Sequence, residues 1–196
     1  MDTTSTPQIH REPRAGTPWP GWRIGLVLLV GALTGALLIF GQGADDGVTA
    51  FAPATAVGIA TLSYLAAAVT GIRWMAWAWV AVGTALVFLG RLADVPPWLL
   101  LAAAGGTLVV VGLVRRPAVT TPQALAMLGY FGLAVIALFL APRIGLALAG
   151  LALAVHAVWD VVHYRRDVVV GRGLAVWCIG LDVVAGVGCI VLAVAG

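Results

Sequence analysis

The sequence predicts an all-α, polytopic membrane protein with seven transmembrane helices. Of its 196 residues, 62% are hydrophobic and only 10% are charged, whereas about 25% of the residues in a typical soluble domain are charged. The apolar residues fall in segments of about 20, the length of helix that crosses the hydrocarbon core of a bilayer. These observations exclude a soluble globular fold and leave little mass outside the membrane.

The amino-terminal 21 residues are polar and differ from the rest of the chain. They are rich in Pro and Thr and lack the apolar core of a signal peptide. A segment of this composition cannot bury enough apolar surface to fold. We therefore expect residues 1–21 to form a disordered cytoplasmic tail and residues 22–196 to form the transmembrane domain, with Trp19 and Trp22 near the membrane interface.

Seven apolar segments follow this tail, separated by short polar or proline-containing intervals. Proline is poorly tolerated inside a helix but is accepted at its start, so Pro97 and Pro122 mark predicted starts. The predicted helices cover about residues 23–40, 51–70, 73–90, 97–114, 122–141, 143–164 and 173–195.

The distribution of arginine predicts the orientation in the membrane. The chain contains no lysine, and short loops rich in arginine stay in the cytoplasm. With the amino terminus inside, only Arg91 and Arg143 fall outside, and the other nine arginines fall inside. We therefore predict a cytoplasmic amino terminus and an external carboxyl terminus.

The composition also indicates the source of the chain. Arginine takes the place of lysine throughout, and the chain is rich in Ala, Val and Gly, as in proteins from high-GC genomes. We therefore expect a bacterial inner-membrane protein.

The last two predicted helices carry the most unusual side chains. An ionisable group inside a membrane costs roughly 2.5 kcal/mol or more, so such groups usually face a bundle interior and mark function. His156, Asp160 and His163 are spaced i, i+4, i+7, which places them within a stripe of about 60° on one helix. At 1.5 Å per residue, His156 and Asp182 lie about 13 and 15 Å from the cytoplasmic ends of their helices. The two helices therefore present polar groups at matching depth.

Three interpretations of this group remain open. Imidazole and carboxylate side chains on facing helices can hold zinc or another divalent metal, with His156, Asp160 and Asp182 as ligands and His163 as fourth ligand or catalytic general base. The same residues can form a proton pathway in a coupled transporter of a small molecule. In the third interpretation, hydrogen bonds among them lock the two helices together.

Further residues are candidates for contact with a lipid or other small-molecule substrate. They are aromatic or soft side chains predicted at a similar depth: Cys178, Tyr64, Trp159 and Trp177. Two histidines on one stripe of a single helix cannot bind opposite faces of one haem, and the absence of lysine excludes a retinal Schiff base. Nothing in the net charge of +3 indicates nucleic acid, because topology explains it. The sequence does not indicate an oligomeric state.

The pattern H-x3-D-x2-H at residues 156–163, followed by W-C-x3-D at residues 177–182, resembles a motif of small bacterial multi-pass membrane proteins. Seven helices, an internal amino terminus and a His/Asp group on the cytoplasmic side also resemble the zinc-dependent membrane hydrolase superfamily of the alkaline ceramidases and the progestin and adiponectin receptors. This resemblance implies zinc and hydrolysis of a lipid amide or ester. The last two helices would supply the ligands, because the first five contain neither His nor Asp.

Overall fold

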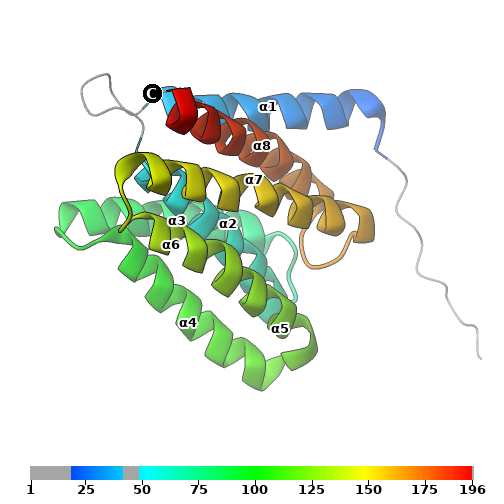
Figure 1. Cartoon of the computed structure of the whole chain (residues 1–196). Coiled ribbons are helices and arrows are strands. Elements are labelled where there is room, and N and C mark those ends of the chain that lie inside the picture. The colour runs from blue at the N-terminus through cyan, green and yellow to red at the C-terminus, as the bar shows by residue number, and fades with distance from the viewer. Residues whose placement is uncertain (1–18, 42–48, 196) are drawn as a thin grey trace, which may run out of the picture.

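The computed structural model describes residues 19–41 and 49–195, and every regular element in these ranges is a helix (Figure 1). Seven helical segments among them are long and apolar enough to cross a membrane, which confirms the predicted fold class. The elements are α1 (Gly21–Phe40), α2 (Phe51–Thr70), α3 (Met75–Leu92), α4 (Pro97–Arg115), α5 (Pro117–Ala126), η1 (Met127–Phe131), α6 (Gly132–Ala137), α7 (Pro142–Arg166) and α8 (Arg172–Ala195). Most of the predicted tail lies outside the described residues, and the orientation stays a prediction.

The fifth membrane-spanning segment differs most from its predicted bounds. It begins at Pro117 rather than Pro122 and ends at Ala137 rather than residue 141. Pro117 occupies the first turn of α5, where its missing N–H costs nothing, and Pro122 lies inside the helix. The span continues through the π-helical turn η1, a local widening that often occurs at functional sites.

Helix α2 is the centre of the bundle. In its apolar segment 83% of the residues are buried, against 50% or less in each of the other six spans. It packs against α3, α4, α5, η1 and α7 (Figure 1). A helix that is apolar on every side and buried on every side is expected at the core of a helix bundle. Side chains from α2 therefore reach into the interior next to α7.

Helix α8 packs between α1 and α7 through small residues (Figure 1). A methyl group at Gly31 of α1 would overlap the carbonyl oxygen of Trp177, and one at Gly35 would lie 2.6 Å from the carbonyl oxygen of Leu181. Glycine at these positions lets the two backbones approach closely, as is common in membrane bundles. The α1 contact holds α8 from the side opposite α7.

A short turn joins α7 to α8 and sets the two helices side by side. Asp167 ends α7 in a left-handed conformation, with φ 48°. Arg73, from the α2–α3 connection, forms an ion pair with Asp167 and donates a hydrogen bond of 2.9 Å to the carbonyl of Val170. Because this turn is tied to the end of α2, the polar residues of α7 and α8 are held against the central helix.

Candidate metal centre

His156 and Asp160 of α7 meet Asp182 of α8 inside the bundle. His156 Nδ1 lies 2.8 Å from Asp182 Oδ2 and 3.6 Å from Asp160 Oδ2. The side chains of His156 and Asp160 are 0% exposed and that of Asp182 is 1% exposed. The contact between His156 and Asp182 agrees with the matching depth expected from the sequence.

These three residues form a group that can hold a metal ion. One ligand atom from each, an imidazole nitrogen and two carboxylate oxygens, lies within 4.8 Å of the others. In a tetrahedral zinc site with ligands at about 2.0–2.1 Å, neighbouring donor atoms are about 3.3 Å apart. Small side-chain movements would therefore bring all three atoms to one ion. Imidazole with carboxylates suits zinc and several other divalent metals.

Tyr64 of α2 supports the group from the central helix. Its hydroxyl donates a hydrogen bond of 2.6 Å to Asp160 Oδ1, and the residue is 1% exposed. A donor of this kind fixes the carboxylate in place, as residues behind metal ligands commonly do. The sequence proposed Tyr64 for substrate contact, and that role stays a prediction. The structure adds the contact with Asp160, which the sequence did not indicate.

Aromatic rings enclose the imidazole of His156. The ring of Tyr130, from η1, meets it edge-on with 5.2 Å between centroids, and the ring of Tyr64 does so at 5.7 Å. Tyr130 was missed at the level of sequence, although its position in a Gly-containing stretch of an otherwise apolar helix was a possible signal. Tyr130 belongs to the π-helical turn η1, and such turns often occur at functional sites. The two rings cover the imidazole, whose side chain is 0% exposed.

Part of the group has no hydrogen-bond partner. Among the described residues, His156 Nε2 and Asp160 Oδ2 are buried and accept or donate no hydrogen bond. A buried carboxylate without a compensating charge is costly. No arginine of the described residues makes an ion pair with Asp160 or Asp182. Positive charge at this position must come from a proton or from a bound cation.

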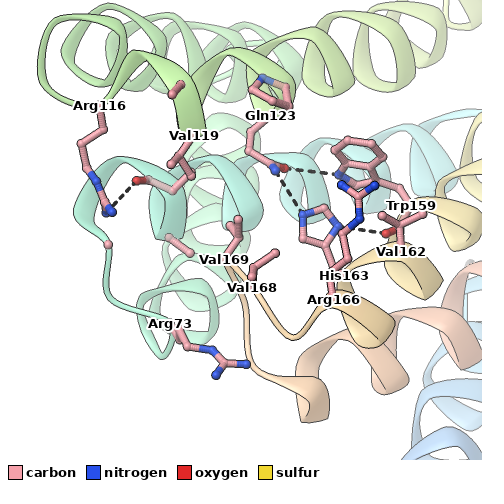
Figure 2. A pocket seen from close by; sticks show the side chains of 15 residues that line it. Arg73, Arg116, Val119, Gln123, Trp159, Val162, His163, Arg166, Val168 and Val169 are labelled. Atoms are coloured by element: carbon pink, nitrogen blue, oxygen red, sulfur yellow. Dashed lines mark hydrogen bonds between the residues drawn. The ribbon is translucent and has the colours of Figure 1, made fainter. Parts of the chain in front are cut away.

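His163 lies on the same helix but in a different network. Its Nδ1 donates to the carbonyl of Trp159 at 2.9 Å, and its Nε2 accepts from Gln123 Nε2 at 3.1 Å. Trp159 Nε1 in turn donates to Gln123 Oε1 at 3.2 Å, so a neutral His163 protonated on Nδ1 satisfies every bond (Figure 2). His163 is not among the three grouped ligands. Its predicted roles as fourth ligand or general base stay predictions and would require Gln123 to move.

Two of the cavities next to these networks have a predicted site histidine or aspartate in their lining. The first, which we call the arginine cavity, has a volume of about 550 Å³ and includes His163, Gln123 and Trp159 in its lining (Figure 2). The second, which we call the lateral cavity, has a volume of about 140 Å³ and includes Asp182 and Cys178. Gln123 was missed at the level of sequence, although it is a lone amide in an apolar segment.

The two remaining predicted contact residues are divided between these cavities. Trp159 lines the arginine cavity, and Trp177 lines the lateral cavity, where its ring lies 5.5 Å from that of Trp77. Cys178 is buried beside Trp177 and lines the same cavity. The structure therefore brings Trp177 and Cys178 together with Asp182 but places Trp159 with His163. Their contact with a substrate stays a prediction.

Comparison with known proteins gave no relative: no family model, curated protein or solved structure matches this chain. Its function therefore has to be inferred from the site itself.

Proposed function

We propose that this membrane protein binds a divalent transition metal at His156, Asp160 and Asp182. The observation that supports this most is the charge of the group. Two buried carboxylates face one imidazole, and no arginine in the described part of the chain is paired to them. A divalent cation with a neutral histidine balances both carboxylates. The cation would also be a coordination partner for Asp160 Oδ2, which has no hydrogen-bond partner among the described residues. Zinc is the first candidate, since its ligands are those present.

The proposed activity is hydrolysis of a lipid or another membrane-embedded substrate in the bacterial inner membrane. A metal held by three protein ligands keeps an open position for water and makes that water a nucleophile for an ester or amide. The lateral cavity supports access from the apolar side, since Leu38, Ile59, Val80 and Leu181 line it together with Asp182. In this proposal Tyr64 holds Asp160 in its coordinating orientation. The resemblance to the zinc-dependent hydrolase superfamily belongs to the same proposal.

A proton-coupled carrier is the second candidate. It is favoured by the order in which α2 contacts the lateral cavity, the His/Asp group and the arginine cavity. Residues 55–63 of α2 contribute to the lateral cavity, Tyr64 contacts the His/Asp group, and residues 67–71 belong to the arginine cavity. The ring of His163 also lies 4.7 Å from that of Tyr64. The His/Asp group therefore lies between the two cavities along α2. A series of ionisable side chains of this kind is typical of proton relays.

Metal content tests the proposal directly. Elemental mass spectrometry of the detergent-purified chain should find about one metal ion per protein, as expected for one ion held by His156, Asp160 and Asp182. His156→Ala and Asp182→Asn should lose it. Asp94→Asn is the matched control, because it makes the same chemical change in a connection at φ 54°, which asparagine tolerates. A folded wild type that stays metal-free after incubation with zinc would refute the metal site.

Vesicles containing the protein separate the two candidate activities. A hydrolase should cleave a fluorogenic fatty-acyl ester, lose this activity with a chelator, and leave an enclosed pH-sensitive dye unchanged. A carrier should instead move protons along an imposed pH gradient when supplied with its cargo, and chelation should not stop it. Proton movement that is lost in Asp182→Asn and insensitive to chelation would favour the carrier.

A further inference from the structure

The arginine cavity has features of a binding site separate from the metal centre. It lies where the end of α2, the start of α5 and the end of α7 meet the turn before α8 (Figure 2). Arg73, Arg116 and Arg166 line it from three different segments, and no Asp or Glu is among the described lining residues. Its volume of about 550 Å³ is within the range of about 300–1,000 Å³ usual for small-molecule sites.

Two of the three guanidinium groups are held in place before any ligand binds. Arg116 Nη1 donates to the carbonyl oxygen of Ala68 at 3.1 Å. It passes directly over Gly71, where an added methyl group would overlap it. Arg73 is fixed by Asp167 and by the carbonyl of Val170. Fixing these long side chains in advance lowers the entropy that binding would cost.

The guanidinium of Arg166 is the third charged group in the lining of the cavity. Within the described residues its guanidinium makes no hydrogen bond or ion pair. Its neighbour Arg165 is also exposed but does not line the cavity. In the same way, Arg116 lines the cavity, whereas its exposed neighbour Arg115 does not. Arginines that only set the topology need a position near the membrane surface but no shared cavity. One arginine of each pair is therefore available for a ligand.

We propose that the arginine cavity binds a phosphate ester through Arg116 and Arg166, with Arg73 contributing to the positive potential. The planar guanidinium donates two parallel hydrogen bonds that match phosphate oxygens. Val119, Val162 and Val169 form an apolar part of the lining, which suits the non-phosphate portion of an amphiphile. The ligand is a phosphomonoester, either on a membrane lipid or on a small soluble molecule. This proposal does not depend on the metal centre.

Native mass spectrometry of the full chain in a neutral detergent provides the test. The probes are dioctanoyl phosphatidic acid, glycerol 3-phosphate as the soluble ester, and dioctanoylglycerol as a lipid without phosphate. We expect phosphatidic acid to bind more tightly than dioctanoylglycerol. Arg166→Gln and Arg116→Gln should each weaken binding about tenfold, the effect of a lost charged hydrogen bond. Arg165→Gln should leave it unchanged, and so should a chelator.

Each result has a defined meaning. Binding of phosphatidic acid alone identifies a lipid head group, and binding of glycerol 3-phosphate with similar affinity identifies a soluble phosphate ester. Both support the site when they depend on Arg166. Equal effects of Arg165→Gln and Arg166→Gln, or equal binding of phosphatidic acid and dioctanoylglycerol, would overturn it. Arg166 is exposed and makes no hydrogen bond or ion pair with the described residues. Its replacement should therefore leave the elution volume and unfolding temperature unchanged, which separates loss of binding from loss of fold.

Discussion

At the scale of single residues, Asp160 depends on one hydroxyl. Within the described residues, Tyr64 donates the only hydrogen bond shorter than 3 Å to this carboxylate, whose second oxygen lies 3.6 Å from His156 Nδ1. A buried charged acceptor that loses its donor is much more costly than a neutral one. Tyr64 therefore connects the central helix α2 to the carboxylate of Asp160 on α7, although α2 itself contributes no histidine or carboxylate.

Replacement of Tyr64 by phenylalanine should weaken metal binding. The change keeps the ring against His156 but removes the hydrogen bond to Asp160. Loss of such a supporting partner typically reduces metal affinity about 10- to 100-fold. Competition with a chromogenic zinc chelator measures the change in affinity.

Tyr130→Phe is the matched control for this variant. Its ring also lies edge-on to His156, but its hydroxyl makes no hydrogen bond to the described residues of the group. We expect its zinc affinity to remain within about threefold of wild type, because no hydrogen bond is lost. If the two variants had the same affinity, Tyr64 would not be a supporting residue of the site.

At the scale of elements, the position of α8 depends on glycine in α1. Gly31 and Gly35 are one helical turn apart and face the backbone of α8 at Trp177 and Leu181. Gly180 of α8 makes the same kind of contact in the other direction, because a methyl group there would meet the backbone of α1 at Leu28 and Ala32. Contact between backbones of this kind leaves no flexible side chain that can move aside.

Gly31→Ala should therefore destabilise the protein. The added methyl group forces α1 away from α8, and overpacking typically costs about 1–3 kcal/mol. Gly25→Ala, in the same helix, meets nothing within 4 Å and should be neutral or slightly stabilising, because alanine is the better helix former by about 1 kcal/mol. Thermal unfolding in detergent, followed by circular dichroism, compares them. A similar midpoint for both variants would contradict the packing explanation.

At the scale of the whole molecule, most arginines of the described residues gather at one end of the bundle. Arg73, Arg116 and Arg166 all line the arginine cavity, and Arg172 lies 3.6 Å from Asp167 in the adjoining turn. Arg91 lies over the ring of Phe51, at the end where α2 begins and α3 ends. The two groups therefore lie at opposite ends of the bundle. The orientation stays a prediction, and it would place the arginine cavity toward the cytoplasm.

Cysteine labelling in intact cells tests this orientation. The native residues Cys178 and Cys189 are buried and give little background. Ala93→Cys, in the α3–α4 connection, should react with a membrane-impermeant maleimide because we predict it to be external. Val168→Cys, in the exposed turn between α7 and α8, should react only after the cells are opened. The reverse labelling pattern would invert the orientation and place the arginine cavity outside.

The sequence by itself determined the class of the protein and the depth of its polar groups. Seven apolar segments predict seven helices, because a bilayer leaves no other way to satisfy the backbone of a single open segment. Helical periodicity also places His156 and Asp160 on one face, and the fixed rise per residue brings Asp182 to their level across a short turn. The face of a helix and the depth along it both depend only on the spacing of residues within one segment of the chain.

Only the tertiary structure decided which other helices complete the site. Helix α2 is buried on every side, so nothing in its apolar pattern distinguishes the face on which Tyr64 meets Asp160. Pro117 and Pro122 are both compatible with a helix start, and in the structure the helix begins at Pro117 and contains Pro122. His163 shares a stripe with His156, yet the approach of α5 pairs it with Gln123. The spacing along a helix sets the direction of a side chain, but the crossing of its neighbours determines its partner.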